Sequence, residues 1–211
     1  QGDEAVQKAR TKDIRSRRKR SRMLTPLVKY YGSEKSVQIA RRCMQIHGGS
    51  GYMTEYGAEK LLRDSLVLPI YEGTSQIQSL MATKDSLQFI FADFTGFMQR
   101  LSSTRLKASM GSDKRTRMTA KIRWRALSAQ RHLITKIIAN KGWALKDIPS
   151  GQRMAFLKDW DAKRDFAPAL LHAERLTRIL CDAAIAEVLF KQIEQFPERA
   201  AILDRFLERA D

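Results

Sequence analysis

Residues 75–101, with the sequence SQIQSLMATKDSLQFIFADFTGFMQRL, carry the longest apolar stripe in the chain. Their apolar side chains recur at steps of three and four residues, as on one face of an α-helix. Ser75 and Gln78 have the spacing of a capping box, which predicts a helix start near Thr74–Ser75. No stretch of useful length alternates as a strand does. The predicted fold class is therefore all-α, a helical bundle. The stripe consists of Ile77, Leu80, Met81, Leu87, Ile90, Phe91, Phe94, Phe97, Met98 and Leu101.

Other helices are predicted on both sides of this stretch. Thr25 and Pro26 read as the N-cap and first residue of a helix that ends at Gly48-Gly49, where glycine supplies a positive φ. A short helix over 58–64 precedes an extended or turn-like segment before Pro69. Three further helices are expected over residues 114–140, 166–195 and 198–210. Their short connections favour antiparallel neighbours, so the second half forms a helical extension of the bundle.

Composition excludes several classes of protein. The 211 residues include 43% hydrophobic side chains, too many for an intrinsically disordered chain. No run approaches the roughly 18 apolar residues of a membrane span. The polar, basic N-terminus lacks the apolar core of a secretory signal. Two cysteines, Cys43 and Cys181, give no disulfide framework, and each is expected to be a small buried hydrophobe.

The net charge of +16 is concentrated in two blocks. Residues 1–29 hold ten basic and three acidic side chains, and residues 99–164 hold seventeen and four. Such blocks suit nucleic-acid phosphates, an acidic membrane surface or a phosphate-rich ligand. The second block is more readily explained as the solvated face of a helix, because apolar residues interrupt it at helical spacing. The alternative function is a nucleic-acid-binding or protein-interaction module.

The glycine-rich centre of the chain, residues 48–74, contains none of the familiar short catalytic or nucleotide-binding motifs. Gly48-Gly49-Ser50-Gly51 lacks both the second glycine of a nucleophile elbow and a preceding strand. It also lacks the spacing of a dinucleotide fingerprint, and no phosphate-binding P-loop occurs. The histidines are isolated from one another and from both cysteines, so no metal site is indicated.

Taken as one unit, the centre resembles the C-terminal signature of acyl-CoA dehydrogenases. The two-part match consists of Gln45-Ile46-His47-Gly48-Gly49-Ser50-Gly51-Tyr52 and Ile70-Tyr71-Glu72-Gly73-Thr74-Ser75-Gln76-Ile77-Gln78, linked by Glu55-Tyr56, Glu59 and Arg63-Asp64. A softer resemblance to the helical extension of longer bacterial-type members covers residues 166–176. The resemblance implies two regions, 1–108 as a partial C-terminal helical domain and 109–211 as the extension.

The resemblance also implies a flavin-dependent chemistry that converts acyl-CoA to α,β-enoyl-CoA. Glu72 falls on the family's general base, and Gly73 on the backbone that lies against the substrate thioester. An α proton is weakly acidic, so its base needs an apolar pocket that raises its pKa toward neutrality. The positions matching FAD contacts are Gln45, Ile46, His47, Gly48, Gly49, Thr74 and Gln76. In relatives, the turn at 45–49 reaches the cofactor of a neighbouring subunit.

The chain lacks a counterpart of the family's central β domain and of the first bundle helices. We therefore expect weak or absent activity of the isolated chain, and a homo-oligomer or a complementary dehydrogenase chain as partner. The family further implies acyl-CoA as substrate, an electron-transferring flavoprotein as acceptor, a role in fatty-acid β-oxidation, and the bacterial cytoplasm or mitochondrial matrix as compartment.

Overall fold

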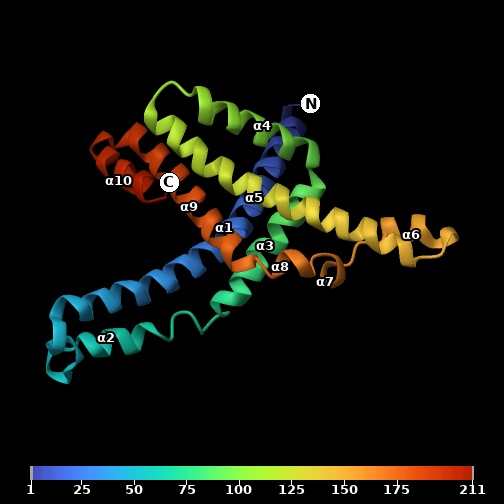
Figure 1. Cartoon of the computed structure of the whole chain (residues 1–211). Helices are drawn as coiled ribbons and strands as arrows, with labels where there is room; N and C mark the ends of the chain where they lie inside the picture. The colour runs from blue at the N-terminus through green and yellow to red at the C-terminus, as the bar shows by residue number, and fades with distance from the viewer. Residues whose placement is uncertain (1, 211) are drawn as a thin grey trace. The chain divides into compact units, whose positions relative to one another are not determined.

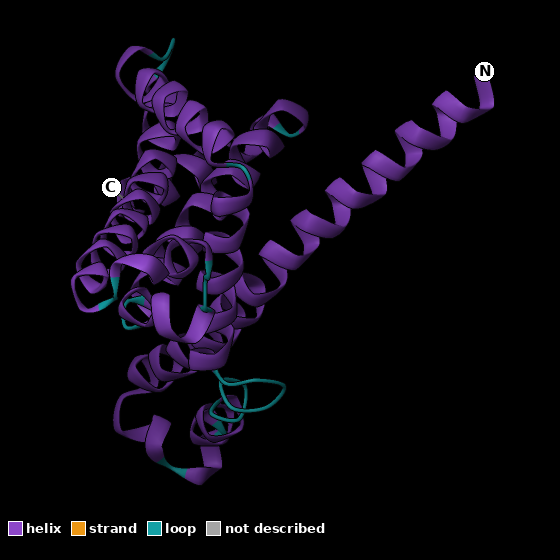
Figure 2. Ribbon diagram, turned by 90° about the vertical axis from the view of Figure 1, so that its right-hand side faces the viewer, coloured by secondary structure: helices purple, strands orange, loops and turns teal. Residues whose placement is uncertain are grey.

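The computed structural model of the chain describes residues 2–210, and these residues fold as helices joined by short loops, with no strand among them (Figure 2). The predicted all-α class is confirmed. The α-helices are α1 (Gly2–His47), α2 (Ala58–Ser65), α3 (Ser75–Ala92), α4 (Phe94–Met110), α5 (Lys114–Ala144), α6 (Arg153–Lys158), α7 (Ala162–Asp165), α8 (Ala167–Leu170), α9 (Ala173–Gln195) and α10 (Ala200–Ala210). Short 3₁₀ helices are η1 (Gly48–Tyr52), η2 (Thr54–Tyr56), η3 (Leu145–Asp147), η4 (Ser150–Gln152) and η5 (Pro197–Arg199).

The chain divides into two compact units, residues 1–85 and residues 86–211, with the division inside α3. The domain boundary predicted between residues 108 and 109 stays a prediction. In the first unit, η1 and η2 reverse the chain after α1, and α2 packs back against α1 (Figure 1).

The prediction that a helix begins at Thr25-Pro26 is wrong, because α1 runs through Pro26 without a break. The Thr25 hydroxyl donates to the Ser21 carbonyl oxygen at 2.9 Å, instead of capping a helix end. Proline in a helix interior removes one hydrogen bond and costs about 3 kcal/mol. Burial of Leu27 and Tyr30, and a two-bond ion pair between Arg22 and Asp85, stabilise the helix around this defect. The predicted end of the helix at Gly48 is confirmed, with φ at 60°.

The stripe over residues 75–101 is divided between two helices, not one as predicted. Asp93 leaves the helical conformation, with φ −143° and ψ 64°, and its carboxylate accepts a hydrogen bond from the Gly96 N–H at 3.0 Å. It is therefore the N-cap of α4, a role that aspartate fills well because its oxygen satisfies a free helix N–H. The apolar periodicity continues across the break, which explains why the pattern alone did not reveal it.

The core of the second unit is built around α5. This helix packs against α4 on one side and α9 on another, and α10 contacts both α9 and α5 (Figure 1). One apolar cluster includes Leu87, Phe97 and Ile137, and a second includes Ile122 and Leu203. Each such fully buried side chain stabilises the unit by roughly 1.5–3 kcal/mol. The predicted helix over 114–140 is confirmed and extends to Ala144.

The segment predicted as one helix over 166–195 contains α8 and α9, separated at Leu171-His172.

A buried ion pair joins the segment of residues 153–165 to α5. Lys141 Nζ lies 2.8 Å from Asp165 Oδ2, and the two side chains are only 2% and 5% exposed. Lys141 also donates to the Asp159 carbonyl and lies 4.1 Å from the centre of the Trp160 ring.

Candidate functional site

The turn between α2 and α3, which carries Glu72, is held against α1 by Lys29. The Lys29 ammonium donates to the Leu68 carbonyl oxygen at 2.8 Å and lies 4.0 Å from the centre of the Tyr71 ring. A cation over an aromatic face adds about 0.5–1 kcal/mol at an exposed site. One side chain of α1 therefore fixes both the backbone and an aromatic ring just before Glu72.

Glu72 and Gly73 both adopt positive φ angles, 51° and 93°. For a non-glycine residue this left-handed conformation is uncommon and is worth examination for function. The Gln78 amide stabilises it by donating to the Glu72 carbonyl oxygen at 3.1 Å. A Cβ on Gly73 would stand 2.6 Å from that same amide nitrogen and displace it, and the φ of 93° itself disfavours any residue with a side chain. The Glu72 residue itself is exposed.

The predicted capping box at the start of α3 is displaced by one residue. The Thr74 hydroxyl, not that of Ser75, accepts from the Ile77 N–H at 3.3 Å and caps the helix. Ser75 is buried and instead donates to Glu34 Oε1 of α1 at 2.6 Å. This bond ties the first turn of α3, with Thr74 and exposed Gln76, to α1.

The second predicted group, residues 45–49, forms the end of α1 and the start of η1. All five residues are exposed, and Ile46 is exposed to 84%. His47 Nδ1 lies 2.9 Å from the Cys43 carbonyl oxygen, a contact within its own helix turn that leaves the residue exposed. Gly51 closes the turn, because a Cβ there would lie 2.6 Å from the Met44 carbonyl oxygen.

The structure does not bring the two predicted groups together. Residues 45–49 precede α2 and residues 72–76 follow it, so the groups lie at opposite ends of that helix and its adjoining turns (Figure 1). An eight-residue helix alone is about 12 Å long. Arg63 and Asp64, which belong to the signature, form an ion pair only at 3.9 Å and on the surface, where an ion pair contributes little.

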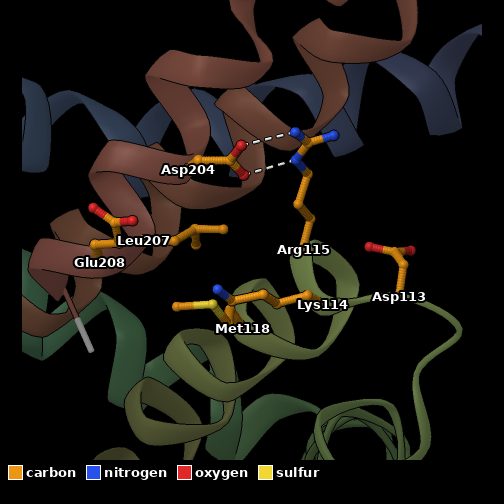
Figure 3. A pocket seen from close by; sticks show the side chains of 7 residues that line it. All are labelled: Asp113, Lys114, Arg115, Met118, Asp204, Leu207 and Glu208. Carbon is orange, nitrogen blue, oxygen red and sulfur yellow. Dashed lines mark hydrogen bonds and ion pairs between the residues drawn. The ribbon is translucent and has the colours of Figure 1, made fainter.

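Two surface pockets of about 400 Å³ each, both in the second unit, were not predicted. The first lies between α5 and α10 and contains the Arg115–Asp204 ion pair, with two bonds of 2.7 Å (Figure 3). Arg115 lowers the pKa of Asp204 by hydrogen bonding to its carboxylate. The second pocket is lined by Gln88, Phe91, Trp160 and Phe166. No sequence pattern signalled either pocket, because each joins residues more than 70 positions apart.

Within the described residues, no group of three or more histidine, cysteine or acidic side chains is placed to hold a metal ion. Nor does any helix of residues 2–210 combine the length and apolar composition needed to cross a bilayer.

Residues 5–87 match the family model for the acyl-CoA dehydrogenase C-terminal domain. Similar curated proteins include the probable acyl-CoA dehydrogenase YngJ of Bacillus subtilis, 47% identical over 60 residues, and the 3-(aryl)acrylate reductase of Clostridium sporogenes, 42% identical over 62 residues. The caffeyl-CoA reductase-Etf complex subunit CarC of Acetobacterium woodii is 47% identical over 55 residues.

These three matches cover 28%, 29% and 26% of this chain, and 16%, 16% and 14% of the respective relatives. No solved structure matches the chain. Residues 5–87 are therefore identified as a C-terminal acyl-CoA dehydrogenase segment, and the resemblance of residues 45–78 is confirmed, while that of residues 166–176 stays a prediction. The dehydrogenases that share this segment are oxidoreductases.

Proposed function

We propose that this chain is the C-terminal part of an FAD-dependent acyl-CoA dehydrogenase, with Glu72 as the general base that removes the substrate α proton. The observation that carries the proposal is the Glu72-Gly73 turn. It combines the family's base with a left-handed backbone that Lys29 and Gln78 hold in place. Such a preorganised turn sets the direction of a carboxylate before substrate arrives, which is what proton abstraction requires.

The chemistry assigned to each residue follows from its place in the turn. Glu72 takes the α proton of the acyl thioester. The backbone at Gly73 lies against the thioester, where an N–H stabilises the enolate oxygen as the proton leaves. Without a side chain at Gly73, the substrate can approach the backbone closely. Bound FAD supplies the acceptor for the β hydride.

The residues at the start of α3 fit one part of a flavin dinucleotide. Thr74 and Gln76 stand at the positive end of an 18-residue helix, where free N–H groups and the helix dipole favour phosphate oxygens. Gln45, Ile46, His47, Gly48 and Gly49 form an exposed turn that we assign to a second flavin contact. This turn and the pair Thr74 and Gln76 lie at opposite ends of α2. We therefore assign the turn to the flavin of a neighbouring copy.

The chain supplies only one wall of the proposed cleft. Glu72 is exposed here, as are its neighbours Ile70 at 64% and Tyr71 at 45%. A base in contact with water lacks the apolar cover that the reaction needs. The proposed holoenzyme is therefore an oligomer, or an assembly with a complementary dehydrogenase chain. We propose acyl-CoA as substrate and β-oxidation as role. An electron-transferring flavoprotein is the proposed acceptor, supported by the Etf complex named for the CarC relative.

The test uses a chimera of the Bacillus subtilis relative YngJ in which the C-terminal dehydrogenase segment is replaced by residues 5–87 of this chain. We expect the chimera to retain flavin, and its visible absorbance to bleach when acyl-CoA is added without oxygen. Glu72→Gln should abolish bleaching and leave flavin bound, whereas Glu55→Gln, on the 3₁₀ helix η2, should bleach normally. Bleaching by the Glu72→Gln chimera at the unsubstituted rate would refute the assignment of the base.

The same spectrum, recorded on the isolated 211-residue chain mixed with FAD and filtered, tests the proposed incompleteness. We expect little retained flavin. Stoichiometric flavin that bleaches with acyl-CoA would show that copies of this chain alone complete the cleft.

A further inference from the structure

One of the two surface pockets of the second unit is lined almost entirely by aromatic rings. We call it the aromatic pocket, and it has a volume of about 400 Å³. Pockets that bind small molecules have volumes of roughly 300–1,000 Å³ and combine apolar walls with a few polar groups. The lining residues are Gln88 and Phe91 of α3, Trp160 between α6 and α7, and Phe166 just before α8.

The three rings of the aromatic pocket are held by contacts within the unit. The Phe91 and Phe166 rings are nearly parallel, with an interplanar angle of 4° and centres 5.7 Å apart. The Trp160 ring is tilted against both, with its centre 5.1 Å from that of Phe91. Lys141 Nζ, fixed by its buried ion pair with Asp165, lies 4.1 Å from the centre of the Trp160 ring. Walls that are already ordered lose little conformational entropy when a ligand binds.

Folding alone leaves part of this aromatic surface in water. Phe166 is only 6% exposed, but Trp160 is 43% exposed. Tryptophan is highly buried on average, and burial of its remaining apolar surface would stabilise the unit further. A ligand in the aromatic pocket would cover the ring surface that the chain itself leaves uncovered.

Two side chains of the aromatic pocket have hydrogen-bonding groups available for a ligand. Within the described residues, neither the Gln88 side-chain amide nor the Trp160 indole N–H bonds to another group of the chain. The amide offers both donors and an acceptor, and the indole offers one donor. None of the four lining side chains is charged, and Lys141, the cation in contact with Trp160, is already paired with Asp165. A charged ligand would therefore lose hydration without gaining a counter-ion.

We propose that the aromatic pocket binds an uncharged, planar aromatic ring system whose edge carries an amide-like donor and acceptor. Flat rings match the walls, because aromatic pairs gain free energy from stacked and tilted contacts beyond the area that they bury. The amide-like edge matches Gln88, whose side chain pairs a donor with an acceptor. A flexible acyl chain fits less well, since it loses rotamer freedom on binding and offers no partner to Gln88. This site lies apart from the Glu72 turn, and the proposal does not depend on the dehydrogenase assignment.

The test measures binding of 2-quinolone, a flat and uncharged lactam, to the full chain by isothermal titration calorimetry. We expect one probe to bind per chain, with a Kd on the order of 0.1 mM, as suits a ligand of this size. Two further probes separate the features of the ligand. Decahydro-2-quinolone keeps the lactam edge but is not flat, and octanamide keeps an amide on a flexible chain. Both should bind at least about tenfold more weakly.

Two variants place the probe in the aromatic pocket. Trp160→Leu removes the exposed ring, and Gln88→Leu removes the amide; each should weaken 2-quinolone binding by about tenfold. The matched control is Gln195→Leu, at an exposed position in the last turn of α9, which should bind within about twofold of the unsubstituted chain. Circular dichroism checks the fold of each variant. If Trp160→Leu loses helix, the exposed Gln88 position still provides the test.

Three results would overturn the proposal. The first is absence of 2-quinolone binding to the unsubstituted chain at millimolar concentration. The second is equal affinity for 2-quinolone and its decahydro analogue, or tighter binding of octanamide, since the pocket would then not select flat rings. The third is unchanged binding in Gln88→Leu and in a folded Trp160→Leu, which would place the probe elsewhere on the chain.

Discussion

Replacement of Lys141 by methionine should destabilise the second unit more than any other single change to its polar groups. The side chains of Lys141 and Asp165 lie 2.8 Å apart and are almost completely buried. Removal of one partner of a buried ion pair costs about 3–5 kcal/mol, because the remaining charge stays desolvated. For a unit of this size, that corresponds to a fall in Tm of roughly 10–20 °C.

The double variant Lys141→Met/Asp165→Leu distinguishes the ion pair from simple packing. With both charges gone, no buried charge remains, and replacement of such pairs by apolar groups is often neutral. Arg164, the other cation on Asp165, is 46% exposed in its side chain and can turn to water. We therefore expect the double variant to regain most of the stability lost by Lys141→Met in urea unfolding followed by circular dichroism. A double variant no more stable than Lys141→Met would refute the reasoning.

The same pair predicts a pH dependence. Burial alone would raise the pKa of Asp165, but hydrogen bonds from Arg164, Lys141 and the Asp161 N–H outweigh it and hold that pKa well below 3.8. Its stabilisation is therefore fully present above about pH 3.8 and is lost as the pH falls toward the lower folded-state value. Asp165→Asn should remove this part of the acid dependence of unfolding. An unchanged acid profile in Asp165→Asn would contradict the assignment.

Two smaller predictions concern the first unit and the cysteines. Gly73→Ala should lower the free energy of unfolding by about 1–2 kcal/mol, because alanine resists a φ of 93° and its Cβ would displace the Gln78 amide. Gly32 lies in the middle of α1 with open space around it, so Gly32→Ala should stabilise the helix by about 0.5–1 kcal/mol. Equal effects in urea unfolding would contradict the strain at Gly73. Burial raises the pKa of Cys181 to about 12, so iodoacetamide at neutral pH should modify half-buried Cys43 well before Cys181. Mass spectrometry follows the two modifications, and the reverse order would contradict the burial of Cys181.

Helical periodicity predicted the elements well and their ends less well. The apolar stripe of residues 75–101 correctly indicated helix, but the pattern continues across Asp93 and could not show that a side-chain cap divides it. Pro26 was expected to start a helix. A local rule could not show that an ion pair between Arg22 and Asp85, 63 residues apart, stabilises α1 around this proline.

The candidate site shows the same limit. The resemblance assigned Glu72 and Gly73 to the candidate site, but no motif indicated their positive φ angles. Nor did any motif signal the hydrogen bonds from Lys29 and Gln78 that hold this turn. Thr74 caps α3 in place of Ser75, because Glu34 of α1 takes the Ser75 hydroxyl. Both details arise from contacts between α1 and the start of α3, which local patterns do not encode.

The separation of the two predicted groups in the first unit leads to a test of the assembly. If the proposed site draws Glu72 from one copy and the turn at Gly48 from its neighbour, no single copy can complete it. Variants at the two places should then complement each other: Glu72→Gln disables the base, and Gly48→Val disables the turn, because a β-branched residue cannot adopt a φ of 60° without strain. In statistically mixed dimers of the two inactive YngJ chimeras, about a quarter of the sites combine both intact groups. Recovery of about that fraction of the dehydrogenase rate on mixing would support a shared site. No recovery, with mixed dimers demonstrated by mass spectrometry, would show that each copy uses its own turn and that α2 must rearrange to bring the groups together.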